Sequence, residues 1–325
     1  MYLVLLGYKD YERVKMMPIL SIVIPAYNEE KMILKAAYTI SELLNKEKIS
    51  AEILFVNDGS EDNTWKEIQR ASQEIENVRG ISLSRNFGKE SAILAGLTHA
   101  KGDCCIVMDC DLQHPPETII EMYRLWKDGY DIVEGFKKSR GKEGIIKTFF
   151  AKSFYRLINR VTGFDMSASS DFKLLDRKVV DAYLQLPERK VFFRALTFWL
   201  GFKSIGVEYE VQERTEGKTK WSYLSLIKYA ITNITSFSTA PMQIITIIGV
   251  LFFIFSIVLG VQSLINFFSG RSLEGFTTVI LLLLGIGSVL MMSLGIIGYY
   301  IAKIYEEVKR RPRYIVSEKT NDKDE

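Results

Sequence analysis

The sequence of 325 residues predicts an α/β domain with a mostly parallel sheet, followed by two membrane-spanning helices. Three observations support this prediction. Short runs rich in β-branched residues alternate with helical stretches through residues 19–135. A polar cluster follows each of the first four runs, and two long uncharged runs lie near the C-terminus. The length allows one such domain together with an appendage.

Strands and helices are expected to alternate along the first part of the chain. The expected strands are residues 19–25, 52–57, 78–82, 104–108 and 132–135. The expected helices are residues 30–44, 64–75 and 90–100. Strands that alternate with helices form a mostly parallel sheet, and ligands bind beyond the carboxyl ends of such strands. The chemistry is therefore expected at those ends.

Two apolar runs, residues 242–264 and 276–301, are each long enough to cross a hydrocarbon core, which takes about 20 helical residues. Within residues 229–302 the only charged residues are Arg271 and Glu274, between the two runs. A pair of buried core helices is the alternative interpretation, but uncharged runs of this length are rare in soluble domains. Basic residues flank the pair on both sides, so the positive-inside rule places both termini in the cytoplasm.

The N-terminal apolar stretch, residues 2–7, is too short for a signal peptide, and acidic residues follow it. The expected location is the cell membrane, as a multi-pass protein with its catalytic domain in the cytoplasm. Cys104, Cys105 and Cys110 fit buried strand residues better than a disulfide framework or a metal site. A net charge of +3 does not indicate a nucleic-acid partner.

Four polar clusters follow the first four expected strands. Their sequences are PAYNEE, NDGSED, SRNFGK and DCDLQHPP, beginning at residues 25, 57, 84 and 109. One cluster alone, such as Asp58-Gly59-Ser60, could be an ordinary turn with a helix cap. In a parallel sheet all four clusters meet at one edge, which predicts a ligand site there.

Asp109 and Asp111 predict a site for Mg²⁺ or Mn²⁺. Two carboxylates one residue apart at a strand end can hold a cation that prefers oxygen ligands, together with phosphate oxygens and water. Such a cation would neutralise charge that builds on a diphosphate leaving group. Gln113 could add a ligand or a hydrogen bond. His114 precedes two prolines and is interpreted as a loop residue.

The motifs IPAYNEE, VNDGS, RNFGKE and DCDLQHPPE, in this order and spacing, resemble those of the inverting family-2 glycosyltransferases. The resemblance implies the GT-A fold, a Rossmann-like sheet with helices on both faces. Within that family the chain, from about residue 19 to residue 304, is similar to the polyprenyl-phosphate glycosyltransferases, the group of dolichyl-phosphate mannose synthase and bactoprenol glucosyltransferases. A hexosyltransferase is therefore expected, which transfers one sugar with inversion to polyprenyl (undecaprenyl) phosphate. UDP-glucose is the first expectation for the donor and a nucleotide-linked N-acetylhexosamine the second.

The resemblance implies roles for residues of the four clusters. Asp58 is expected to accept a hydrogen bond from uracil N3–H, and Lys89 to lie near the nucleotide. Asp109 is expected to contact the nucleotide-sugar and, with Asp111 and Gln113, the metal. The remaining residues expected to line the nucleoside pocket are Pro25, Ala26, Tyr27 and Glu29.

Asp171 and Asp111 are the expected catalytic residues, Asp111 through the metal. Asp171 lies in Ser170-Asp171-Phe172, where relatives usually read Gly-Asp-Phe, and the resemblance implies that it is the catalytic base. A phosphomonoester with a second pKa of about 6 is already largely ionised at neutral pH and scarcely needs a base. Orienting a sugar hydroxyl or a cation is the alternative role for Asp171.

The acceptor is expected on the basic segments near the membrane. Apolar and basic residues alternate at helical spacing over about residues 143–161, which predicts an interfacial amphipathic helix; a helix packed on the sheet is the alternative. A second amphipathic helix, residues 222–240, leads into the first span. The residues expected to bind the acceptor phosphate are Arg140, Arg214, Lys218, Thr219 and Lys220. A solvated basic turn is the alternative interpretation of the last four.

The expected organisation is an N-terminal extension (1–18), a transferase domain (19–221), the juxtamembrane helix, the two spans (241–304) and a cytoplasmic tail (305–325). A processive polysaccharide synthase is one rival function, but residues 194–199 do not match the Gln-x-x-Arg-Trp element of those enzymes. A non-catalytic membrane scaffold is the other rival. Glycines in both spans permit close helix packing, so a homo-oligomer is a further expectation.

Overall fold

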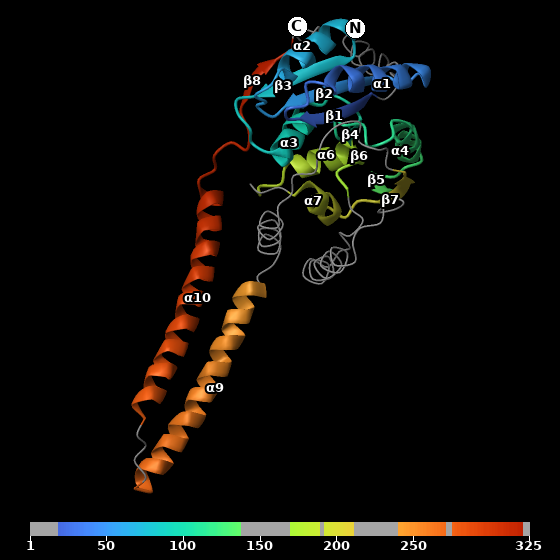
Figure 1. Ribbon diagram of the computed structural model, residues 1–325. Helices are drawn as coiled ribbons and strands as arrows, with labels where there is room; N and C mark the ends of the chain where they lie inside the picture. The colour runs from blue at the N-terminus through green and yellow to red at the C-terminus, as the bar shows by residue number, and fades with distance from the viewer. Residues whose placement is uncertain (1–18, 138–169, 189–191, 211–239, 271–274, 321–325) are drawn as a thin grey trace, which may run out of the picture. The chain divides into compact units, whose positions relative to one another are not determined.

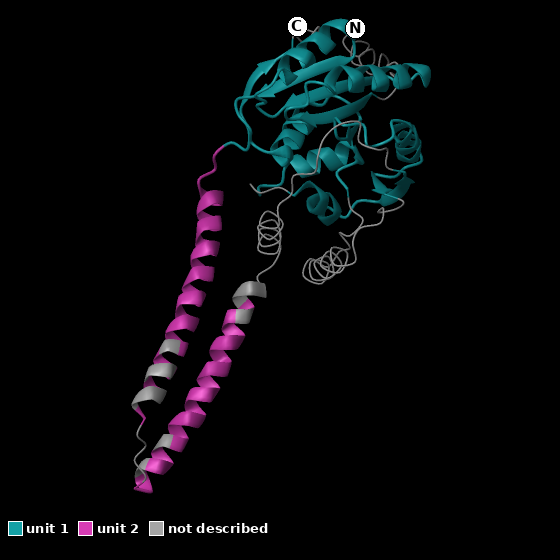
Figure 2. Cartoon of the chain, viewed as in Figure 1, with its two compact units in different colours: residues 1–150, 165–219, 312–325 teal, residues 151–164, 220–311 magenta. Residues whose placement is uncertain are grey.

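The computed structural model describes residues 19–137, 170–188, 192–210, 240–270 and 275–320 (Figure 1). The chain divides into two compact units (Figure 2). Unit 1 comprises residues 1–150, 165–219 and 312–325, and unit 2 comprises residues 151–164 and 220–311. Unit 1 therefore contains chain segments from both sides of the apolar runs.

Unit 1 is built on an eight-stranded sheet among the described residues, in the order β7-β5-β6-β4-β1-β2-β3-β8. The strands are β1 (Leu20–Ala26), β2 (Ala51–Asn57), β3 (Val78–Leu83), β4 (Cys104–Val107), β5 (Ile132–Lys137), β6 (Lys173–Asp176), β7 (Ser204–Tyr209) and β8 (Val316–Lys319). Strands β4, β1, β2 and β3 run parallel to one another. Their carboxyl ends therefore meet at one edge, as the alternation of strands and helices predicted.

Helices cover both faces of this sheet, which confirms the expected fold class. The helices of unit 1 are α1 (Ile33–Lys46), α2 (Thr64–Glu74), α3 (Lys89–His99), α4 (Glu117–Lys127), α6 (Arg177–Leu184) and α7 (Phe193–Trp199). Leu20, Ile22 and Ile24 of β1 belong to the buried core that α1, α2 and α4 complete on one face. Val23, between them, meets α3 on the other face, since a Cβ on Gly96 would lie 2.2 Å from it. The alternating direction of strand side chains produces this division.

Strand β6 inserts antiparallel between β4 and β5, and the sequence did not predict it. Val107 pairs with Lys173 and Cys104 with Asp176, so the beginning of β6 lies beside the end of β4. Two antiparallel neighbours, β4 and β5, follow from this insertion. Residues just before β6 are thereby brought to the edge where the parallel strands end.

The last described segment of the chain is a strand of the same sheet. β8 pairs antiparallel with β3, and the backbone N–H of Ser84 donates to Ile315 O at 2.9 Å. The Trp65 indole N–H donates to Glu318 at 2.8 Å, and the Gly80 N–H donates to Thr320 Oγ1 at 2.9 Å. The expected cytoplasmic tail is therefore in part an edge strand of unit 1.

The described part of unit 2 consists of two apolar helices, α9 (Ala240–Phe268) and α10 (Phe276–Val308), which contact each other. Both are long and apolar enough to cross a membrane, judged by length and composition. They include the two runs that the sequence predicted as spans and extend beyond them at one or both ends.

Candidate functional site

A cavity of about 320 Å³ lies where β1, β2 and β4 end. Seven of its lining residues are those expected to bind a nucleotide-sugar: Pro25, Ala26, Tyr27, Glu29, Asp58, Lys89 and Asp109. Asp111 lines the cavity as well. The volume falls in the usual range for small-molecule sites, about 300–1,000 Å³. The four polar clusters thus converge on one cavity.

The loop after β1 is held by polar residues that follow β2. The Asn28 N–H donates to Ser60 Oγ at 3.0 Å, and the Glu61 N–H returns a hydrogen bond to Asn28 Oδ1 at 2.9 Å. The Glu29 N–H donates to Thr64 Oγ1 at 2.9 Å. Asn28 itself has a φ of 56°, a left-handed conformation that asparagine tolerates better than most residues. These bonds fix the loop that presents Tyr27 and Glu29 to the cavity.

Asp58 holds a second wall of the cavity, the loop after β3. Its two carboxylate oxygens accept from the backbone N–H groups of Phe87 and Gly88, at 2.8 and 2.9 Å. Burial raises the pKa of Asp58, and the two backbone hydrogen bonds act in the opposite direction. Asp58 therefore has a structural role, holding the loop after β3, in addition to the role expected for it at the uracil ring.

Asp109 and Asp111 stand on a tight loop directly after β4. Leu112 adopts a left-handed φ of 53°, an uncommon conformation for a branched apolar residue and one that often marks a functional site. The turn brings the backbone N–H of Gln113 to Asp111 Oδ1 at 3.1 Å. Gln113 thus contacts the Asp111 carboxylate through its backbone N–H.

The Asp109 and Asp111 pair fits a divalent cation. Among the described residues, no group of three or more His, Cys, Asp and Glu side chains is close enough to hold a metal by itself. Mg²⁺ commonly binds through one or two carboxylates together with substrate phosphates, and Mn²⁺ accepts similar oxygen ligands. Two carboxylates in the wall of a cavity of nucleotide size have this character.

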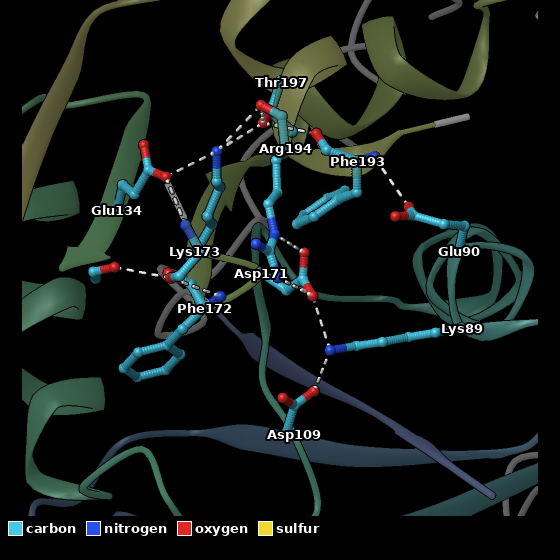
Figure 3. Close-up of polar contacts among 12 residues, drawn as sticks. Lys89, Glu90, Asp109, Glu134, Asp171, Phe172, Lys173, Phe193, Arg194 and Thr197 are labelled. Carbon is cyan, nitrogen blue, oxygen red and sulfur yellow. Dashed lines mark hydrogen bonds and ion pairs between the residues drawn. The ribbon is translucent and has the colours of Figure 1, made fainter. Parts of the chain in front are cut away.

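Asp171 lies beside the cavity because β6 runs antiparallel to β4. Asp171 is 7% exposed, and its carboxylate contacts two cations (Figure 3). Lys89 Nζ lies 2.7 Å from Asp171 Oδ2 and 2.5 Å from Asp109 Oδ1. Arg194 donates from Nε to Asp171 Oδ1 at 2.7 Å and from Nη2 to Oδ2 at 3.0 Å. Lys89 therefore bridges the expected metal ligand and the expected base.

These contacts determine the charge states of the network. Burial raises the pKa of Asp171, but the hydrogen bonds from Arg194 and the charge of Lys89 outweigh it and hold the pKa well below its ordinary value. Burial lowers the pKa of Lys89, but the charges of Asp109 and Asp171 outweigh it and raise the pKa above the ordinary value. Asp171 is thus a carboxylate and Lys89 an ammonium at neutral pH.

Arg194 is held in turn by Glu90 and the buried Lys173, which contact the first turn of α7. Glu90 Oε2 accepts from the Phe193 N–H at 2.9 Å. Lys173, 1% exposed, donates to Thr197 Oγ1 at 3.0 Å and to Arg194 O at 3.4 Å, and lies 3.1 Å from Glu134 Oε1 (Figure 3). A buried ion pair between β5 and β6 and a carboxylate from α3 thereby fix the position of α7.

Several expected site residues lie outside the described part of the chain. They are the acceptor-phosphate residues Arg140, Arg214, Lys218, Thr219 and Lys220. The interfacial helix at 143–161 and all but the last residue of the helix at 222–240 lie there as well. Their roles remain predictions.

The sequence patterns assign no role to Arg194, Glu90 or Asn86, although Asn86 lies within the motif RNFGKE. Asn86 and Gly88 line the cavity. Residues 194–199 do not match the Gln-x-x-Arg-Trp element, so no motif indicates a role for Arg194. No sequence pattern joins Asp171 to Arg194, because they become neighbours only once α7 packs beside β6.

The comparison with a family model gives a match to "Glycosyl transferase family 2" over residues 21–184. An uncharacterized glycosyltransferase of Synechocystis sp. is 40% identical over 301 residues, which cover 92% of this chain and 95% of that protein. A prophage bactoprenol glucosyl transferase homolog of Escherichia coli is 36% identical over 299 residues, which cover 91% of this chain and 98% of that protein. These similarities include the apolar C-terminal region as well as the sheet.

Solved structures share the fold at low sequence identity. Glucosyl-3-phosphoglycerate synthase from Mycobacterium tuberculosis, in complex with Mg²⁺ and UDP, has a TM-score of 0.50 at 18% identity, with coverage of 70% of this chain and 82% of that chain. At this identity the likeness concerns the fold alone. The family model and the relatives, taken with the cavity at the strand ends, show that the chain is an enzyme of glycosyl transferase family 2.

Proposed function

We propose that the protein transfers glucose from UDP-glucose to a polyprenyl phosphate, with inversion at the anomeric carbon and with a divalent cation. The observation that carries the proposal is the cavity at the strand ends, where Asp109, Asp111 and Lys89 face a space of nucleotide size. Relatives named bactoprenol glucosyl transferase, 36% identical over 91% of the chain, support this donor and this acceptor. An N-acetylhexosamine is the alternative sugar.

Each part of the cavity has a role toward the donor. Pro25, Ala26 and Tyr27 would receive the nucleoside, with Asp58 holding the loop that closes over it. Asp109 and Asp111 would hold the Mg²⁺ or Mn²⁺ ion, which when bound stabilises the negative charge of the diphosphate. The Lys89 ammonium adds a fixed positive charge beside that position.

The reaction itself needs little proton chemistry from the protein. An oxygen of the lipid phosphate attacks the anomeric carbon, the bond from that carbon to the diphosphate oxygen breaks, and UDP leaves with the electron pair. A phosphomonoester with a second pKa of about 6 attacks in its ionised form at neutral pH, so no group must remove a proton from it. An α-linked donor thereby gives a β-linked glycolipid.

The acceptor is a membrane lipid, so the proposal includes membrane attachment. We propose that α9 and α10 span the cell membrane and that both termini lie in the cytoplasm. The supporting observations are the apolar windows of the two helices and the basic residues that flank them in the sequence. Arg140, Arg214, Lys218, Thr219 and Lys220 are proposed to bind the lipid phosphate near the membrane surface. The interfacial helix at 143–161, the domain boundaries given above and a homo-oligomer belong to the same proposal.

A transfer assay tests the function. Purified protein in detergent is given radiolabelled UDP-glucose, undecaprenyl phosphate and Mn²⁺ or Mg²⁺, and the lipid product is separated by chromatography. We expect one labelled sugar per lipid, with transfer lost in EDTA and restored by added metal. Asp111→Asn is expected to lower transfer at least about 100-fold, because it removes one of two carboxylates from the cation site. Undiminished transfer by Asp111→Asn would remove the metal from the mechanism.

The same assay separates the rival functions. A processive synthase would give a polymer that remains at the origin of the chromatogram, whereas the proposed enzyme gives a single-sugar lipid. A scaffold would bind no UDP in the presence of Mn²⁺. Parallel reactions with UDP-N-acetylglucosamine identify the sugar.

A further inference from the structure

We propose that Arg194 is a positioning residue for the transfer reaction, which acts through Asp171 on the ammonium of Lys89. The inference rests on the proposed function, because it assigns a part in that reaction. It also gives Asp171 a different task from the proton acceptor that the family resemblance implied. Asp171 becomes the middle of a chain of three charged side chains that ends in the cavity wall.

The geometry at Asp171 favours a fixed carboxylate. Its two oxygens accept from three N–H groups on two cations, at 2.7 Å from Arg194 Nε, 3.0 Å from Arg194 Nη2 and 2.7 Å from Lys89 Nζ. A bidentate guanidinium contact fixes the plane of a carboxylate as well as its position. A proton on either oxygen would neutralise the anion that both cations contact, which costs electrostatic energy. The arrangement therefore suits an orienting group and opposes proton transfer to Asp171.

Lys89 is the group that this carboxylate orients. Lys89 stands at the first position of α3, directly after the left-handed Gly88, and its side chain contributes to the cavity wall. Its ammonium lies between Asp171 and Asp109. Asp109 also belongs to the proposed cation site. Asp109 alone would therefore not fix the position of this ammonium. Asp171 supplies a second anchor that is independent of the cation site.

Arg194 is anchored more firmly than a surface arginine. Phe193 donates its backbone N–H to Glu90, and Lys173 donates to the carbonyl of Arg194 itself. These partners come from α3 and β6, so two different elements fix the part of α7 that carries Arg194. A misplacement of about 1 Å at a reacting centre can lower a rate about 100-fold. The chain from α7 to Lys89 has the rigidity that such positioning requires.

The test is a set of transfer rates for Arg194→Gln, Arg194→Lys, Lys89→Met and the double variant Arg194→Gln/Lys89→Met. We expect Arg194→Gln to lower kcat about 10-fold to 100-fold, as for the loss of a charged, bidentate contact that positions a catalytic group. Arg194→Lys keeps the charge and is expected to recover part of the rate. The double variant should be no slower than Lys89→Met alone, because both changes act through one group. Arg124→Gln, which removes an exposed contact to Glu47, is the matched control and should keep the wild-type rate.

Two results would overturn the inference. One is a wild-type kcat in Arg194→Gln, and the other is a double variant whose loss equals the product of the two single losses. The double variant separates positioning from folding, because a merely structural defect in Arg194→Gln would add to the effect of Lys89→Met. Such a defect would also lower the unfolding temperature of Arg194→Gln, which is measured alongside the rates. If Asp171 were the base, its release from Arg194 would raise its basicity, and kcat would stay or rise. Failure of the proposed function would appear differently, as no transfer by the wild type.

Discussion

Gly59 gives the sharpest test of how the cavity is built, because its Cα lies against the backbone of the opposite loop. A Cβ at this position would lie 2.2 Å from the carbonyl carbon of Arg85 and 2.5 Å from the backbone nitrogen of Asn86. Ordinary contacts of a Cβ begin at 3.4 Å. Gly59 also has a φ of 64°. The change Gly59→Ala therefore requires the loop after β3 to retreat by roughly 1 Å and also introduces backbone strain.

The expected cost has two parts. An alanine in the left-handed region costs about 1 kcal/mol. A retreat of about 1 Å would break the hydrogen bonds of 2.8 and 2.9 Å from Phe87 and Gly88 to Asp58, and a hydrogen bond to a charged group contributes about 1.5–3 kcal/mol. We therefore expect Gly59→Ala to lower the free energy of unfolding by about 3 kcal/mol or more. UDP affinity should fall as well, because Asn86 and Gly88 of the displaced loop line the cavity.

Gly129→Ala is the matched control. Gly129 has a φ of 90°, and within the described chain no other heavy atom lies within 4 Å of an added Cβ. It should show the backbone strain alone, about 1 kcal/mol, with unchanged UDP affinity. Denaturant unfolding in detergent and calorimetric titration with UDP and Mn²⁺ provide the two measurements. Equal losses of stability in the two variants, or full UDP affinity in Gly59→Ala, would refute the close approach of the two loops.

Three further predictions concern stability. Burial and the charge of Asp171 raise the pKa of Glu90 from 4.5 to about 7, so its contribution to folding is fully present below about pH 4.5 and is lost as the pH rises through 7. Glu90→Gln should remove up to about 3 kcal/mol of this pH dependence, measured by unfolding between pH 5 and 8, and equal slopes for the two proteins would contradict it. Tyr183→Phe should stabilise unit 1 by about 1 kcal/mol in denaturant unfolding, because the buried Tyr183 hydroxyl has no hydrogen-bond partner among the described residues; a loss of stability would indicate a partner. Trp65→Phe removes the hydrogen bond to Glu318, so the amides of β8 should exchange with solvent about 5-fold faster while those of β1 do not change; unaltered exchange would show that this bond adds nothing.

The sequence predicted those parts of the fold that local patterns encode. The β-branched runs that became β1 to β5 and the polar clusters after the first four strands are contiguous in the sequence, and their spacing places them at one edge of a parallel sheet. All seven residues expected at the nucleotide line the cavity for this reason. Helix and strand ends differ from the expected ones by a few residues.

Features that depend on pairing between residues far apart in the sequence could not be predicted from local patterns. β6 has only four residues, and its antiparallel position between β4 and β5 has no local signature. The contact of Asp171 with Arg194 follows from that position and from the packing of α7. β8 consists of Val316, Ser317, Glu318 and Lys319, a polar sequence typical of a tail, and becomes a strand because the edge of β3 offers backbone partners. A short polar segment gives no hydrophobic pattern from which to predict this.

The place of β8 limits how the catalytic unit can be separated from the apolar helices. A stop codon before residue 220 would remove both helices and would also remove the eighth strand, leaving the backbone groups of β3 open to pairing with another molecule. A flexible linker that joins residue 219 to residue 312 would keep β8 in the chain. The same order of segments affects biosynthesis. The ribosome must synthesise both apolar helices before the chain can supply β8, so unit 1 can complete its sheet only after both helices have been translated.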